Sequence, residues 1–217
     1  MEIPLFPLHT VLFPGMPVNL HIFEKRYQLM INRCIDERQP FGVVLIQTGQ
    51  EALGELAEPH LIGCTARILR VERLDQGRMN IACLGHERFR ILSLDKSSYP
   101  YLVGQVELFP FPEESPQQSE VLGEQVRNQL KKFVDILSRI RGEEFQGQQL
   151  PENPTLLAYM AATLLQIPAT EKQALLESEN IEQFYRALSV ILSREIVLLE
   201  AIASKSGPMM TKVFSKN

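Results

Sequence analysis

Four prolines in the first 27 residues prevent the start of this chain from forming a helix. They are Pro4, Pro7, Pro14 and Pro17. Each proline removes a backbone donor, fixes φ and pushes the preceding residue toward an extended conformation. Pro14 and Gly15 form a turn signal, because glycine can take a positive φ. The alternating apolar residues from Pro17 to Ile22 predict a half-buried strand after that turn.

The rest of the first half reads as one helix followed by short strands. Apolar residues at helical spacing predict a helix over Glu24–Arg38, and the continuous apolar run Phe41–Ile46 predicts a strand buried on both faces. The apolar parity changes at Ile68-Leu69, which predicts a bulge there. Bulges bend strands, and bent strands close barrels, so this half favours a small closed barrel or a sandwich.

Glycines mark the corners expected in these strands. Asp75-Gln76-Gly77 predicts a hairpin connection with Gly77 in the left-handed position. Gly85-His86-Glu87 predicts a break between the strand that carries Met79 and a later strand over Phe89–Leu94. A last strand is expected over Tyr101–Leu108.

A proline-rich linker separates this half from a helical one. We expect a β-rich domain over 1–109, a linker over 110–118, a helical domain over 119–207 and a flexible tail over 208–217. Apolar residues three or four positions apart from Leu122 to Ile140 indicate a long helix, and the final helix should run to about Ala203. The other predicted helix starts are Asn153-Pro154, Thr170 with Gln173, and Asn180 with Gln183.

Several blocks of the sequence resemble one family in order and spacing. They are the opening IPLFPLHTVLFPGMPVNLHIFEKRY, FGVVLI at Phe41–Ile46, the stretch from Ile62 to Leu92, and EKQALLE at Glu171–Glu177. Together they resemble the N-terminal, substrate-binding domain of Lon protease over nearly the whole chain. The resemblance implies an α+β fold, with a β-rich PUA-like pseudo-barrel that carries one helix and a C-terminal helical bundle. It also implies that the chain holds polypeptide substrates.

The same resemblance implies a binding module and not a catalyst. The sequence has no GxxxxGK[ST] phosphate loop and no GxSxG nucleophile elbow. The ATPase and Ser-Lys proteolytic domains of the family would follow the region that matches. We therefore expect a stand-alone, non-enzymatic relative that binds no cofactor.

Composition limits the compartment and the partners. The net charge is −4 and three cysteines lie far apart, without a CxxC pair. A sparse, odd set of cysteines favours reduced thiols and a cytoplasmic protein. The start does not resemble a signal peptide, and no apolar run approaches the roughly 20 residues that span a membrane.

Residues that bind metals or attack substrates are scattered. The four histidines are isolated in sequence, so we expect no metal site. Cys34 could act as a nucleophile beside a histidine, but it lies on the apolar stripe of the first helix, where cysteine behaves as a small hydrophobe. A small-ligand or enzyme site between the two halves, containing Cys64 or His86, stays an alternative.

An arginine cluster leaves an RNA-binding alternative open. PUA-like folds include RNA binders. Acidic residues stand among the arginines, so cross-strand pairs on a solvated sheet are the simpler interpretation, and nucleic acid is not the expected partner. The cluster consists of Arg67, Arg70, Arg73, Arg78, Arg88 and Arg90.

The opening turn supplies the predicted binding residues. Leu12, Phe13 and Met16 place bulky apolar groups at a turn, and Met79 adds an adaptable side chain. We expect them to rim an exposed apolar groove for unfolded or exposed hydrophobic polypeptide segments; the alternative is that Leu12 and Phe13 close the barrel end. A protease or chaperone is a candidate partner, and a weak homo-oligomer is a further option.

Overall fold

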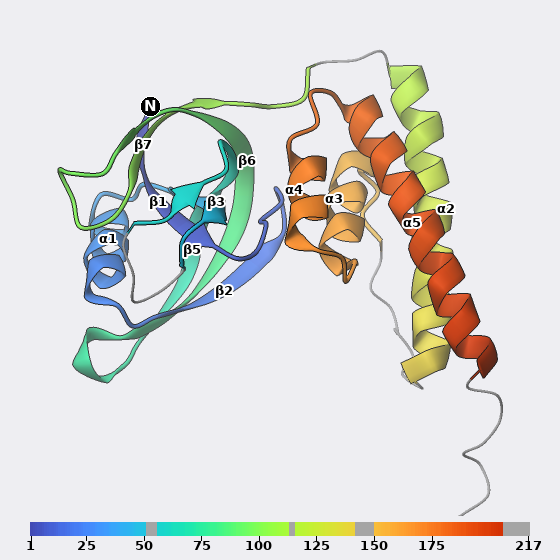
Figure 1. The fold of residues 1–217 in the computed structure, drawn as a ribbon, viewed down its shortest axis with the longest axis horizontal. Helices are drawn as coiled ribbons and strands as arrows, with labels where there is room; N and C mark the ends of the chain where they lie inside the picture. Colours follow the sequence, from blue (N-terminus) through green and yellow to red (C-terminus); the bar gives the residue numbers. More distant parts are fainter. Residues whose placement is uncertain (51–55, 113–115, 142–149, 206–217) are drawn as a thin grey trace, which may run out of the picture.

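A computed structural model describes residues 1–50, 56–112, 116–141 and 150–205 of the protein (Figure 1). Strands fill the first half and helices the second. The strands are β1 (Glu2–Leu8), β2 (Pro17–Ile22), β3 (Phe41–Thr48), β4 (Glu58–Pro59), β5 (Ile62–Arg73), β6 (Met79–Asp95) and β7 (Val103–Leu108). The α-helices are α1 (Lys25–Asp36), α2 (Pro116–Arg141), α3 (Pro154–Leu164), α4 (Ala169–Leu176) and α5 (Ile181–Lys205). The expected α+β architecture is confirmed.

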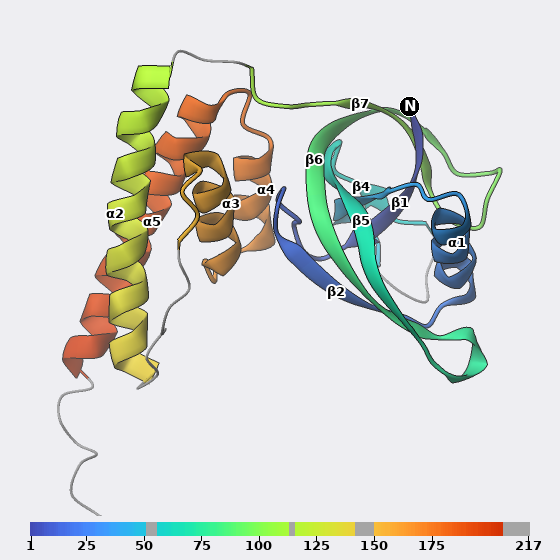
Figure 2. The ribbon, with the colours of Figure 1, turned by 180° about the vertical axis from the view of Figure 1, so that it is seen from behind.

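The strands close into a barrel. Their order is β1-β7-β6-β5-β3-β4, and a parallel pairing of β1 with β3 closes the ring. β2 pairs with the first part of β6, outside the ring (Figures 1 and 2). The helix α1 lies against the barrel, where Tyr27 stacks on Phe6 with ring centroids 4.2 Å apart. The β-rich half with one helix is therefore present as expected.

Strand β5 bends where the apolar parity changes. The pairing of β5 with β6 slips between Ile68 and Arg70, which confirms the predicted bulge. The connection to β6 is a short 3₁₀ turn, η1 (Asp75–Gly77), in which Gly77 takes the expected positive φ of 73°. Gln76 adopts a left-handed φ of 61° as well.

The predicted break at Gly85-His86-Glu87 is wrong. Strand β6 continues through these residues from Met79 to Asp95. Gly85 allows a close backbone approach, because an added Cβ would lie 2.3 Å from the Phe13 carbonyl oxygen. The glycine therefore marks a crossing of two chain segments and not the end of a strand.

The helical half is built on a parallel pair. Contacts between α2 and α5 advance in the same direction along both helices, as Figures 1 and 2 show. Gln125 reaches Ser189 at 3.0 Å, and Lys132 reaches Glu200 at 2.9 Å. The helices α3 and α4 form the crossover between them and lie on the barrel side (Figure 1).

Two of the three predicted helix caps are present. The Asn153 side chain accepts a hydrogen bond from the Leu156 N–H at 2.9 Å, and Asn180 accepts one from Gln183 at 2.8 Å. The third prediction is wrong, because α4 begins at Ala169 and the residue before it is Pro168. The ring of Pro168 fixes φ at the residue before the helix, so the chain enters α4 without a capping side chain.

Barrel and helices share one apolar core. A single cluster of buried side chains extends from Phe6 and Phe41 in the barrel to Leu130 and Phe184 in the helices. The helix α2 begins at Pro116, inside the stretch predicted as linker. The division into two domains stays a prediction, and the predicted tail lies outside the described residues.

Among the residues that the structure describes, no helix is long and apolar enough to cross a membrane.

Candidate functional site

The opening turn lies at the junction between the barrel and the helices. Met16 donates to the Phe13 carbonyl at 3.1 Å, and Gly15 takes a φ of 75°, as expected for a turn with proline and glycine at its centre. Two further hydrogen bonds fix the turn to β6: Gly15 N–H donates to the Gly85 carbonyl, and Gly85 N–H donates to Met16.

The side chains of this turn point inward. Leu12, Phe13, Met16 and Met79 are 5%, 0%, 7% and 1% exposed. The Phe13 ring packs on Tyr159 and Phe184, with centroid distances of 5.8 and 6.3 Å. The exposure expected for Leu12, Phe13 and Met16 is wrong, because the turn packs against the helical half. Met79 lies elsewhere, at the start of β6 opposite Ile22 of β2 and Arg73 of β5, and it is buried there as well. A role of this turn in polypeptide binding stays a prediction.

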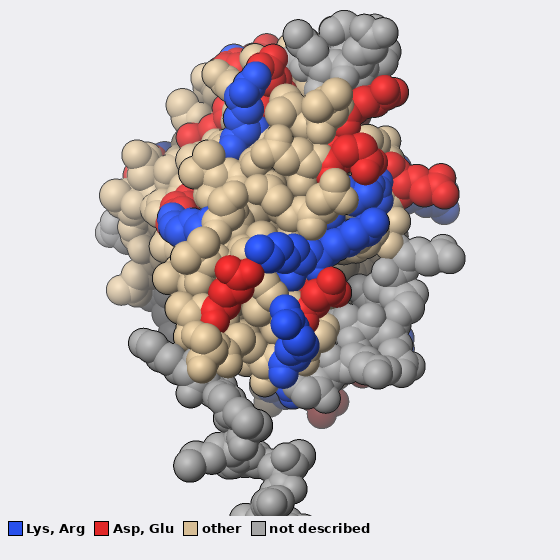
Figure 3. Space-filling model, turned by 90° about the vertical axis from the view of Figure 1, so that its right-hand side faces the viewer, with Lys and Arg blue, Asp and Glu red and all other residues tan. Residues whose placement is uncertain are grey.

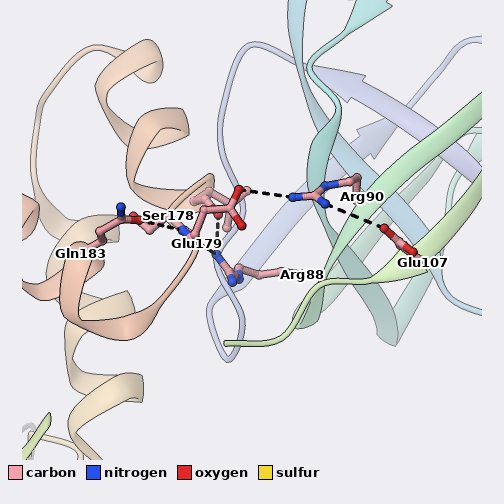
Figure 4. A network of polar contacts seen from close by, with 7 residues as sticks. Arg88, Arg90, Glu107, Ser178, Glu179 and Gln183 are labelled. Atoms are coloured by element: carbon pink, nitrogen blue, oxygen red, sulfur yellow. Dashed lines mark hydrogen bonds and ion pairs between the residues drawn. The ribbon is translucent and has the colours of Figure 1, made fainter. Parts of the chain in front are cut away.

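Arg88 connects β6 to the helical half beside this turn (Figure 4). Its side chain is 2% exposed, and its Nη1 donates to the main-chain carbonyls of Leu176 and Ser178, both at 2.7 Å. The guanidinium lies over the Phe111 ring at 3.7 Å and the Phe109 ring at 4.6 Å. Such contacts stabilise a cation that burial has removed from water.

The residues that the structure describes compensate the charge on Arg88 only in part. Burial lowers the pKa of the guanidinium, because the cation loses its hydration. The described residues supply no partner for its Nε and Nη2 atoms. The neighbouring carboxylate of Glu179 instead lies 3.4 Å from Arg90, which also approaches Glu107 at 3.9 Å (Figure 4).

A cavity of about 360 Å³ opens beside Arg88, and we call it the junction pocket. Apolar rings form much of its wall, and two helices begin at it. Its lining includes Pro14, Arg88, Phe111, Thr155, Tyr159 and Ile181. Thr155 lies in the first turn of α3 and Ile181 is the first residue of α5. The pocket therefore combines a buried cation with the N-terminal ends of two helices.

Sequence reasoning missed most of this pocket. Arg88 was grouped with surface arginines, and Phe111 fell in the predicted linker. A signal was present, since Phe109 and Phe111 alternate with prolines in FPFP, which is more apolar than a solvated linker. Of the residues proposed for a small-ligand site, His86 lines the pocket, whereas Cys64 does not and is fully buried.

A second hollow lies between α1 and β5 and has a volume of about 700 Å³; we call it the α1–β5 groove. Its lining includes Ile35, Arg38, Pro40, Arg67, Leu69 and Arg70. Leu69, at the β5 bulge, is 66% exposed. Beyond Ala66, β5 pairs only with β6 among the described residues, so its other edge is unpaired.

The arginine cluster is divided by the fold. Arg88 is buried at the junction, Arg90 meets two glutamates, and Arg73 donates to Asn32 at 3.1 Å. Arg67 and Arg70 line the α1–β5 groove instead. The cluster is therefore not one continuous basic surface.

The face formed by the helical half carries both signs of charge. In Figure 3, Lys and Arg side chains lie next to Asp and Glu across this face. Arg186 pairs with Glu182 at 2.7 Å, and Arg194 pairs with Glu171 at 2.9 Å. Alternating ion pairs do not form the basic patch that nucleic-acid binding requires.

The three cysteines are free and buried. Burial raises the pKa of the Cys34, Cys64 and Cys83 thiols to about 12, because the thiolate would lose its hydration. No group of three or more potential metal-binding side chains occurs among the described residues. A nucleophilic role for Cys34 therefore has no support in the geometry.

Native protein should react with iodoacetamide at pH 8 at least about 100-fold more slowly than a free thiol, because almost no thiolate is present. Mass spectrometry would count the modified cysteines over time. All three should react quickly in guanidinium chloride, which serves as the control. Rapid modification of any one of them in the native state would contradict the burial described above.

Three comparisons with known proteins all find similarity to Lon proteases or to their N-terminal domain. A sequence model described as the ATP-dependent protease La (LON) substrate-binding domain matches residues 2–194. Lon protease 2 of Herpetosiphon aurantiacus is 26% identical over 201 residues, which cover 92% of this chain and 24% of that protein. The Lon protease of Buchnera aphidicola (subspecies Baizongia pistaciae) is 26% identical over 206 residues, covering 92% of this chain and 26% of its own length. The chain thus spans about a quarter of the relatives it matches.

Solved structures share the fold. A Lon N-terminal domain protein from Xanthomonas campestris superposes with a TM-score of 0.60 at 23% identity, covering 89% of this chain and 98% of that one. The N-terminal domain of Mycobacterium avium complex Lon protease gives a TM-score of 0.66 at 18% identity, with the same coverage. The match of the family model over most of the sequence shows that this chain belongs to the LON substrate-binding domain family.

Proposed function

We propose that the chain is a non-enzymatic module that binds exposed hydrophobic segments of polypeptides. The observation that carries this proposal is the match of residues 2–194 to a domain described as substrate-binding. The relatives named above are Lon proteases about four times as long as the matching region, and we propose no ATP-dependent or proteolytic step for this chain. A protease or chaperone that receives the bound polypeptide is the partner we propose, in the cytoplasm.

The α1–β5 groove is the surface best suited to such binding. The unpaired edge of β5 presents main-chain N–H and C=O groups at alternate residues, which can pair with an added strand. Main-chain pairing does not depend on side-chain identity. An extended polypeptide could therefore bind there almost regardless of its sequence.

Apolar side chains beside this edge supply the preference for hydrophobic segments. Leu69 is 66% exposed, and Ile35, Ile68 and Val71 line the same groove. Burial of apolar surface contributes roughly 25 cal/mol per Å² before the costs of association are subtracted. A shallow groove of this kind should bind weakly and tolerate many sequences.

Replacing Leu69 with aspartate should weaken binding to a denatured model protein at least about fivefold, because the change puts a charge where an apolar segment would lie. Stability should change by less than about 0.5 kcal/mol, since the side chain is mostly exposed. Fluorescence anisotropy measures the binding and thermal unfolding measures the stability.

Leu92→Asp is the matched control, because Leu92 on β6 is 61% exposed and does not line the groove. It should leave binding unchanged. Equal binding by both variants and the unmodified protein would exclude the groove as the site. Tighter binding of single-stranded RNA than of denatured protein would instead favour the RNA-binding alternative.

A further inference from the structure

We propose that the junction pocket binds a carboxylate carried by an apolar polypeptide segment; this deepens the proposed function and rests on it. The pocket lies between β6, the opening turn and the first turns of α3 and α5. Four features of these residues carry the inference.

The first feature is the free edge of Arg88. Its Nη1 is occupied by the carbonyls of Leu176 and Ser178, whereas Nε and Nη2 have no partner among the described residues. Nε and Nη2 form one edge of the planar guanidinium. Both atoms are shielded from solvent in this structure, so a carboxylate that enters the pocket must displace part of its wall before this edge can donate two parallel hydrogen bonds to it.

The second feature is the lack of a counter-charge for Arg88 within the described part of the chain. The acceptors that Arg88 uses are neutral carbonyls, and no carboxylate among the described residues forms an ion pair with it. Glu87 is the one carboxylate that the described lining contains, and it is exposed. A buried cation without an ionic partner is costly, so an incoming anion would compensate it.

The third feature is the position of two helix N-termini. Thr155 and Ile181, both in the pocket lining, belong to the first turns of α3 and α5. The caps Asn153 and Asn180 accept from the third residue of each helix. This leaves the Thr155 N–H of α3, which begins with a proline, and the first two N–H groups of α5 outside the helical ladder. Both helices therefore present partial positive charge toward the pocket.

The fourth feature is the apolar wall. The rings that surround the pocket are Pro14, Pro110, Phe111, Pro112 and Tyr159. They suit aliphatic or aromatic groups next to the charge. A volume of about 360 Å³ holds a small group and not a folded surface. Arg88 is the one arginine in the described lining, which also holds His86 and Glu87 beside the apolar rings. One arginine fits a monoanionic carboxylate better than a phosphate, which usually gathers several cations.

The carboxylate can come from a polypeptide C-terminus or from an acidic side chain. Three short fluorescent peptides of the same apolar sequence separate the sources: one with a free C-terminus, one amidated, and one amidated with a central glutamate. We expect at least about tenfold tighter binding for a carboxylate peptide than for the neutral amide, because even one of the two charge-assisted hydrogen bonds supports that ratio. The tighter of the two charged peptides identifies the source.

Thr155→Glu places a carboxylate in the pocket from within the protein. It should fold, because an acidic residue in the first turn of a helix is favourable. It should bind all three peptides as weakly as the unmodified protein binds the amide. The matched variant Thr155→Gln has the same size without the charge and should keep at least part of the preference.

Equal binding of the three peptides to the unmodified protein would overturn the inference, as would undetectable binding of all three. Displacement by inorganic phosphate at lower concentration than by acetate would overturn it as well. The peptide comparison and the displacement experiment both use the unmodified protein, so neither depends on whether a variant folds. Binding of a denatured model protein separates this result from the proposed function: if the protein binds it but does not distinguish the peptides, only this inference fails.

Discussion

Phe13→Asp should destabilise the protein by about 4 kcal/mol or more, the largest effect expected from any single change described above. The Phe13 side chain is fully buried between the barrel and the rings of Tyr159 and Phe184. Aspartate would remove these ring contacts and bury a charge with no partner. Urea unfolding followed by circular dichroism measures the free energy of unfolding.

Phe23→Asp is the control for this prediction. Phe23 precedes α1 and is 47% exposed, so the same substitution should change the free energy of unfolding by less than about 0.5 kcal/mol. A Phe13→Asp variant that is as stable as the unmodified protein, yet binds denatured protein more weakly, would restore the turn as a surface binding site.

Gly85→Ala should destabilise the protein by about 3 kcal/mol, although it adds only one methyl group. The new Cβ would lie 2.3 Å from the Phe13 carbonyl oxygen, and this atom belongs to a backbone turn that is hydrogen-bonded on both sides of Gly85. The turn cannot move without breaking those bonds. Thermal and urea unfolding both report the loss.

Leu92→Ala, on the same strand at a position that is 61% exposed, is the comparison for Gly85→Ala. It should change stability by about 0.5 kcal/mol or less. If the two variants were equally stable, the close approach of the turn to β6 would have to be wrong.

Features with a local cause were predictable from sequence. The turn at Pro14-Gly15 follows from fixed and positive φ values, and the bulge near Ile68 follows from a change in apolar parity. The Asn153 cap depends on a residue three positions away. In each case the deciding interaction lies within a few residues or within one strand.

Features that depend on distant residues were not predictable. From sequence, Gly85 predicts the end of a strand. Its actual role depends on the backbone of Phe13, which passes close to it in the fold. Arg88 looks like a surface cation, because the carbonyls of Leu176 and Ser178 that bury it lie about ninety residues further along the chain. The same distance explains why sequence alone does not predict the junction pocket.

The burial of the four predicted binding residues was also not predictable from sequence, because it depends on distant residues. A proline-bounded turn with bulky apolar groups can serve a surface or an interior equally well, and sequence alone does not show what covers it. Phe184, which covers Phe13, belongs to the last helix of the fold. Leu12, Phe13, Met16 and Met79 therefore face the interior of the fold, and their role in polypeptide binding stays a prediction.

The packing of Phe13 against Phe184 has a consequence for synthesis on the ribosome. Phe184 follows Phe13 by 171 residues. At a translation rate of about 5–20 residues per second, Phe184 is therefore synthesised on the order of ten to thirty seconds after the turn that it covers. During this interval Leu12, Phe13 and Met16 lack the helix that packs on the turn in the finished fold. A protein proposed to bind exposed hydrophobic segments therefore exposes such a segment itself during synthesis. The segment becomes covered when α5 of the same chain packs on it.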